Sequence, residues 1–246
     1  MFSPKKQLLK LVTRSVQVTH MEHISPCLRL VRLQGDGINK LSWSPGDKIK
    51  LHIESKMRSY TPSAINFQEQ WMEVIIFLNG YGVASEWARN VHIGDETGFV
   101  GPSHSIPLPN FLPNKVLFLG DETTLGLACA LFTDLPQTTS IEGAIEMGDQ
   151  DKSALSTLNL SLDAALRTAL HGEALYTWLT HWIKREAHIP FLHDDQAIIW
   201  LSGEAETVLT IKQRLVDIGI SPHQFYSKPY WSIRGHRHRK KVQRQL

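Results

Sequence analysis

The stretch Val116-Leu117-Phe118-Leu119-Gly120-Asp121-Glu122-Thr123 decides the fold of the second half of this chain. Its four apolar residues form a short continuous run, as in strands that are buried on both faces of a parallel sheet. A glycine-containing turn follows, and residues 124–133 then read as a helix. The same order returns where Ala197–Leu201 leads through a turn into the amphipathic helix Glu206–Asp217. This repetition predicts a doubly wound α/β domain over residues 113–246.

The first half of the chain has a different rhythm of short strands and turns. Cys27–Leu33 alternates apolar and polar residues, and Glu73–Leu78 is rich in β-branched residues. Turn residues such as Ser44-Pro45-Gly46-Asp47 separate these runs. We therefore predict an antiparallel β-barrel over residues 1–112, followed by the α/β domain. Within that second domain, residues 153–185 are expected to be rich in helix.

Composition narrows the class of protein. The 246 residues carry a formal net charge of +2, with 42% hydrophobic and 20% charged residues, as in a soluble globular protein. This charge is too small to indicate a nucleic-acid partner, and no apolar run approaches a membrane span. The two cysteines lie far apart and have no ligand spacing, so we expect neither a disulfide nor a metal site. The N-terminal residues do not show the pattern of a secretory signal peptide, and we expect a cytoplasmic monomer.

Arg58-Ser59-Tyr60-Thr61 lies just past the strand-like run Lys48–Ile53. Side chains two apart on a strand share a face, so Arg58 and Tyr60 project together. A guanidinium can bind a pyrophosphate with two parallel hydrogen bonds, and a phenol ring can stack on an isoalloxazine. The pattern is therefore typical of a flavin site, with Thr61 at the flavin's polar edge. The alternative is a solvated cation beside a half-buried aromatic ring.

Two further glycine-containing segments are candidates for ligand binding. In Gly80-Tyr81-Gly82-Val83-Ala84-Ser85, small residues permit a close backbone approach, and a helix that begins near Ala84 would direct N–H groups at a phosphate. An ordinary strand-to-helix connection is the alternative. Gly120–Thr123 and Gly203-Glu204-Ala205 follow buried strands, where sheets of this class bind ligands. Helix capping by Asp121 is the alternative there.

The C-terminal end combines aromatic and basic residues. Tyr230 and Trp231 precede Arg234, and Arg237 begins a run of further cations without any acid. The aromatic pair either packs the last turn onto the core or offers its rings to a planar cofactor or an anionic chelate. The cations form either a frayed, solvated terminus or part of a site for an anionic ligand.

Six motifs together carry a family resemblance. They are Arg58-Ser59-Tyr60-Thr61, Gly82-Val83-Ala84-Ser85-Glu86-Trp87-Ala88, Gly101-Pro102, Gly120-Asp121-Glu122-Thr123, Trp200-Leu201-Ser202-Gly203-Glu204-Ala205 and Tyr230-Trp231-Ser232-Ile233-Arg234-Gly235. In order and spacing they resemble those of the siderophore-interacting proteins, which are bacterial ferric-siderophore reductases with a ferredoxin-reductase-like fold. The resemblance spans residues 14–237.

The resemblance implies a role for each matching residue. Arg58 would bind the FAD pyrophosphate, Tyr60 would stack on the isoalloxazine, and Thr61 would bond near its reactive edge. The residues that would bind the cofactor are Arg58, Ser59, Tyr60, Thr61, Asn79, Gly82, Val83, Ala84, Ser85, Asp121, Glu122, Thr123 and Trp231. The catalytic residues would be Tyr60, Thr61, Asp121 and Glu122. The ferric chelate would be held by Lys50, Arg234 and Arg237.

Three positions depart from the family's pattern. Ser63 stands where a second Arg is usual, Asn79 where His is usual, and Val83 where Pro is usual. Each of these positions bears on the phosphate or adenine contacts.

The resemblance implies an FAD-dependent NAD(P)H oxidoreductase that reduces ferric siderophores and so releases Fe(II) for iron uptake. Its partner would be a small-molecule chelate, with neither nucleic acid nor membrane. Two alternatives stay open: a general flavin or ferredoxin-type reductase with another electron acceptor, and a non-enzymatic binding module. Between NADH and NADPH the sequence makes no choice.

Overall fold

The chain divides into two compact units. The computed structural model describes residues 13–78 and 82–233, so Asn79, Arg234 and Arg237 of the predicted site lie outside the described residues. The first unit comprises the residues up to Ser105 together with Leu125–Asp134, and the second comprises Ile106–Thr124 and the residues from Leu135 onward. A domain boundary after residue 112 stays a sequence-based prediction.

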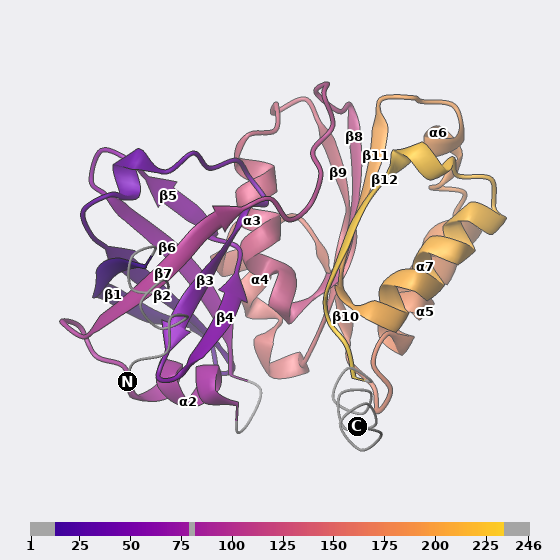
Figure 1. Cartoon of the computed structure of the whole chain (residues 1–246). Helices are drawn as coiled ribbons and strands as arrows, with labels where there is room; N and C mark the ends of the chain where they lie inside the picture. Colours follow the sequence, from indigo (N-terminus) through magenta and orange to yellow (C-terminus); the bar gives the residue numbers. More distant parts are fainter. Residues whose placement is uncertain (1–12, 79–81, 234–246) are drawn as a thin grey trace, which may run out of the picture. The chain divides into compact units, whose positions relative to one another are not determined.

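The first unit is built on an antiparallel sheet of seven strands. Alternation is clearest in Lys48–Ile53, where every second side chain is buried. The strand order is β4-β3-β7-β1-β2-β6-β5 (Figure 1). The strands are β1 (Arg14–Ser25), β2 (Leu28–Gln34), β3 (Lys48–Ile53), β4 (Lys56–Tyr60), β5 (Ala64–Asn66), β6 (Trp71–Phe77) and β7 (Glu96–Ser103).

This sheet curls into a barrel because its two edge strands are neighbours in sequence. β4 ends at Tyr60 and β5 begins at Ala64, although the two strands stand at opposite ends of the order. Tyr60 and Ala64 lie at most about 14 Å apart along an extended chain, whereas six strand spacings of a flat sheet measure about 29 Å. The edges therefore meet at the connection Thr61–Ser63. The antiparallel barrel that the sequence predicts is confirmed.

Among the residues that the structure describes, three short helices belong to the first unit. The turn η1 (Ile38–Lys40) follows β2, and α2 (Val83–Asn90) packs against β3 and β6. The third, α3 (Leu125–Thr133), comes from the second half of the sequence but packs against β5 and β6. Its placement gives the barrel a helix directly behind the connection at Thr61.

The second unit is a parallel five-stranded sheet of order β10-β9-β8-β11-β12. Helices α5, α6 and α7 lie on one face, and α4 lies on the other (Figure 1). The strands are β8 (Lys115–Asp121), β9 (Ser140–Met147), β10 (Asp163–Leu166), β11 (Ala197–Glu204) and β12 (Phe225–Trp231). The helices are η2 (Glu122–Thr124), η3 (Asp149–Asp151), α4 (Ser153–Thr157), α5 (Glu173–Lys184), α6 (Ile189–Leu192), α7 (Ala205–Asp217) and η4 (Pro222–Gln224).

The strand order reverses between β8 and β11, which confirms a doubly wound α/β fold. Residues 153–185 contain two helices, as expected, but also β10, a strand that the sequence does not predict. Its residues Asp-Ala-Ala-Leu favour helix by composition, yet parallel pairing with β9 makes them an edge strand. No helix in the part of the chain that the structure describes has the length and apolarity needed to cross a membrane.

Candidate functional site

Arg58 and Tyr60 lie on one face of β4, as the alternation predicts. The register of β4 against β3 sets Tyr60 opposite Ile49 and Arg58 opposite Leu51. Directly paired residues of antiparallel strands share a face, so both side chains lie on the side of these two buried residues. Tyr60 also packs against the apolar core of the first unit. A ring and a cation are thus held together at the end of an edge strand.

The charges of this pair follow from its burial. Burial raises the pKa of Tyr60 to about 12, while the nearby charge of Arg58 lowers it in part. The phenol is therefore neutral at physiological pH. Arg58 donates a hydrogen bond from Nη1 to the Met57 carbonyl at 3.1 Å. A guanidinium has five N–H donors, so this one bond uses only a small part of its capacity for an anion.

Lys50 and Ser59 lie on the opposite face of the sheet. They pair with each other across β3 and β4, and both are exposed. The expectation that Lys50 holds a ligand beside Tyr60 therefore stays a prediction, and it would require a ligand that reaches around the edge strand.

The connection after β4 is buried and tightly held. Thr61 and Ser63 are each 6% exposed. Ser63 donates to the carbonyl of Glu73 on β6 from its backbone N–H at 2.8 Å and from its hydroxyl at 3.3 Å. Ser63, which stands where the family resemblance implies an arginine, is thus tied to β6 and brings no positive charge to the connection. On the other side, α3 approaches Thr61 so closely that only glycine fits at position 126.

The start of α2 offers backbone N–H groups. Its N-cap residue is Gly82, which has an extended backbone and no side chain with which to cap the helix. Val83, Ala84 and Ser85 form the first turn, and the Ser85 hydroxyl donates to the Phe77 carbonyl at 3.3 Å. An N-terminus of this kind suits an anion.

Asp121 ties the carboxyl ends of three strands together in the second unit. Its Oδ1 accepts from the Thr123 backbone N–H at 3.0 Å. Its Oδ2 accepts from the Glu204 N–H at 3.0 Å and from the Trp231 indole N–H at 2.9 Å. Burial raises the pKa of Asp121, while the bonds from Thr123 and Trp231 act in the opposite direction. These contacts give Asp121 and Trp231 a structural role, and their predicted cofactor contacts stay predictions.

Glu122 forms a buried ion pair that the sequence does not reveal. Its carboxylate bonds to Arg167, and it also accepts from the Gly148 N–H at 3.2 Å. Burial raises the pKa of Glu122 to about 7, and Arg167 lowers it only in part. The pKa of Arg167 is raised as well, because its bonds to Glu122 and Glu146 outweigh its own burial. The side chain of Glu122 is 1% exposed and that of Arg167 is 20% exposed, so the carboxylate loses more of its hydration on burial than the guanidinium does.

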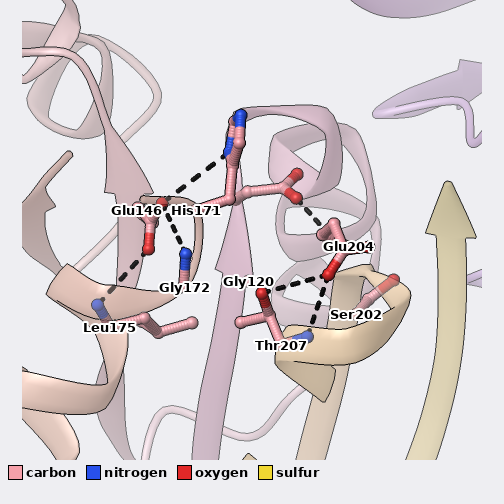
Figure 2. Close-up of a pocket in the computed structure, with 9 residues that line it drawn as sticks. Gly120, Glu146, His171, Gly172, Leu175, Ser202, Glu204 and Thr207 are labelled. Carbon is pink, nitrogen blue, oxygen red and sulfur yellow. Dashed lines mark hydrogen bonds and ion pairs between the residues drawn. The ribbon is translucent and has the colours of Figure 1, made fainter. Parts of the chain in front are cut away.

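Two buried glutamates close the helix starts at this edge of the sheet (Figure 2). Glu146 accepts from the N–H groups of Gly172 at 3.0 Å and Leu175 at 3.4 Å, in the first turn of α5. Glu204 accepts from the N–H groups of Glu206 at 2.8 Å and Thr207 at 2.9 Å, in the first turn of α7. The only sequence signal for these two helix-capping roles is an acidic residue at the end of a buried strand. The sequence analysis named Glu204 but not Glu146.

A hollow lies between these groups, at the strand reversal. Its lining includes the carboxylates of Asp121, Glu146 and Glu204 and the ring of His171, with neither Lys nor Arg among the described residues that line it. His171 meets the Trp231 ring edge-on, with centroids 5.2 Å apart. The hollow measures about 10 Å³, so a nicotinamide ring enters only if side chains at its rim move. Nowhere in residues 13–78 and 82–233 do three His, Cys, Asp or Glu side chains gather as metal ligands would.

Two family models match this chain, and both describe siderophore-interacting proteins. The siderophore-interacting FAD-binding domain matches residues 52–106, and the siderophore-interacting protein domain matches residues 113–234. The chain belongs to the siderophore-interacting protein family. The first match includes β4 and the start of α2, and the second includes the hollow at the strand reversal.

Solved structures share the fold of this family member at low sequence identity. A siderophore utilization protein from T. fusca is 19% identical, with a TM-score of 0.70 over 90% of this chain and 93% of that one. The siderophore-interacting protein SipS from Aeromonas hydrophila is 20% identical, with a TM-score of 0.69 over 95% and 98%. A ferredoxin NADP⁺ reductase from Neisseria gonorrhoeae is 14% identical, with a TM-score of 0.70 over 89% and 99%. The fold is therefore ferredoxin-reductase-like.

Proposed function

We propose that this protein is an FAD-dependent oxidoreductase that takes a hydride from NAD(P)H and reduces ferric siderophores. One observation carries the proposal: the unit that matches the FAD-binding domain holds Arg58 and Tyr60 on one face of β4. Three structural neighbours are named for siderophore binding or use. The crystal of the Neisseria reductase contains FAD and NADP.

The residues of the first unit suit FAD. Arg58 supplies a cation for the diphosphate, and the first turn of α2 supplies N–H groups that Gly82 does not cap. Tyr60 presents a neutral ring for stacking, since its pKa is raised to about 12. Thr61 lies next to it in a buried connection that keeps water away. When bound, FAD supplies the conversion of a two-electron hydride into single electrons that ferric iron accepts.

The chemistry of the acceptor explains why reduction would serve iron release. Oxygen-rich chelators hold Fe(III) far better than the softer Fe(II). A reductase needs no iron ligands of its own for this purpose, because the chelator carries the metal. The contribution of Lys50, Arg234 and Arg237 would be attraction of an anionic chelate.

The donor's nicotinamide end is assigned to the second unit, near Asp121, Glu122 and Thr123. A carboxylate-lined hollow suits an uncharged amide better than a phosphate. Burial raises the pKa of Glu122, the next residue along the chain from Asp121, to about 7, so this carboxyl changes charge near neutral pH.

Anaerobic mixing tests the proposal in two stages. The protein is loaded with FAD and mixed with NADH or NADPH, and the loss of the flavin's visible absorbance is followed. A panel of ferric siderophores is then added to the reduced protein. We expect rapid reoxidation by at least one chelate, with Fe(II) trapped by a coloured chelator. Reduction of the flavin without reoxidation by any chelate would refute the substrate and favour a general reductase. Failure to take up FAD would refute the whole proposal.

A further inference from the structure

The first turn of α3 presses on the connection that carries Thr61. A Cβ atom built at Gly126 would lie 2.7 Å from the Thr61 carbonyl oxygen and 3.9 Å from the Ser63 backbone nitrogen. Carbon–oxygen contacts of this kind settle at about 3.3 Å or more. Any side chain at 126 would therefore displace either the helix or the Thr61 carbonyl by roughly half an ångström. The nearest atom belongs to the backbone, so no change of rotamer relieves the contact.

The same helix face continues along β6. Cys129 is one turn further on and therefore points the same way as Gly126. Its side chain is half-buried, and this burial raises the pKa of the thiol to about 12, with the nearby charge of Glu73 acting in the same direction. Glu73 is also the residue whose carbonyl holds Ser63. The helix thus contacts the connection at Thr61 and, one turn later, comes close to the β6 residue that anchors the connection's far end.

We infer that Gly126 is a positioning residue for the flavin site: its missing side chain lets α3 fix the backbone of Thr61. This inference rests on the proposed function, because it gives Thr61 its place at the flavin edge. The connection Thr61–Ser63 lies between the strands β4 and β5, and the first turn of α3 packs directly against its backbone.

The test is Gly126→Ala, with FAD affinity and flavin spectroscopy as readouts. Alanine forms helix better than glycine, so we expect helical circular dichroism to be kept. Since sites lose function steeply with shifts of about half an ångström, we expect the Kd for FAD to rise at least about tenfold. The absorption spectrum and midpoint potential of the bound flavin should shift as well. A purely structural glycine would leave both unchanged.

Gly94→Ala is the matched control in the same unit. Its Cβ would meet nothing within 4 Å, but its φ of +99° strains any side chain. It should lower stability without changing the flavin's spectrum or Kd. Equal effects of the two variants, or a wild-type Kd and spectrum in Gly126→Ala, would overturn the inference.

If Gly126→Ala does not fold, Cys129→Ala provides the test of whether α3 positions the Thr61 backbone. Loosening this face one turn away should raise the Kd for FAD about threefold or more, whereas an unchanged Kd would overturn the inference. A wild-type protein that binds no FAD would instead refute the proposed function, and the inference with it.

Discussion

Replacement of Glu122 by glutamine should remove a pH-dependent loss of stability from the second unit. Burial raises the pKa of this carboxyl from 4.5 to about 7, against the pull of Arg167. Between these two values the folded state holds a proton that the unfolded state has released, so the free energy of unfolding falls as the pH rises. Each pKa unit corresponds to about 1.4 kcal/mol. The rise in pKa from 4.5 to about 7 therefore lowers the free energy of unfolding of the wild type by roughly 3 kcal/mol above a pH of about 7.

Urea unfolding of both proteins from about pH 4 to about pH 8, followed by tryptophan fluorescence, measures this difference. Glutamine keeps the size of the side chain and does not titrate. Relative to the wild type, Glu122→Gln should gain about 3 kcal/mol between the two ends of the series, most of it between the two pKa values. Glu173→Gln, at an exposed position of the same unit, should follow the wild-type profile. Parallel curves for wild type and Glu122→Gln would show that Arg167 keeps the carboxylate ionised, contrary to the burial argument.

Three further outcomes follow from single contacts. Arg58→Gln should raise the Kd for FAD at least about tenfold, because it removes the guanidinium charge that would bind the diphosphate. Lys50→Gln, on the opposite face, should leave this Kd unchanged. Equal effects of the two variants in an FAD titration would contradict the assignment. Gly203→Ala should lower the free energy of unfolding by about 1–3 kcal/mol, since its φ is +111° and a Cβ would lie 2.5 Å from Asp121 Oδ2; a wild-type denaturation midpoint would contradict this. Trp231→Phe leaves a buried carboxylate without one donor and should cost about 1–3 kcal/mol, unless thermal melts of variant and wild type coincide.

The strands could be predicted wherever burial produces a pattern of apolar residues in the sequence, either a continuous run or an alternation. β8 and β11 are continuous apolar runs, and β3 alternates strictly. β10 leaves no such trace, because it is four residues long and gains its structure from pairing with β9. The position of α3 could not be predicted either. Its apolar sequence predicts a buried helix, but it does not indicate which of two apolar surfaces the helix packs against.

The candidate site divides in the same way. Arg58 and Tyr60 are two residues apart, so the strand's own geometry places them on one face. Arg167 is 45 residues from Glu122, and Trp231 is 110 residues from Asp121. Contacts at such separations depend on strand order and register, which no local pattern records. For that reason the sequence analysis identified Asp121 and Glu204 at the ends of buried strands, but it did not identify Glu146 or the contacts that these acids make with distant strands and helices.

The helix N-termini are capped differently in the two units, and this difference favours binding of FAD by the first unit and of the nicotinamide nucleotide by the second. In the second unit, α5 and α7 begin against the carboxylates of Glu146 and Glu204, and Asp121 accepts from the turn before α3. A helix N-terminus attracts anions through its free N–H groups, and a buried carboxylate both fills those groups and repels a phosphate. In the first unit, α2 begins at a glycine without a cap of its own. Under the proposed function, a diphosphate anchored by a helix start would therefore lie at α2, whereas a dinucleotide bound by the second unit would hold its phosphates through other contacts.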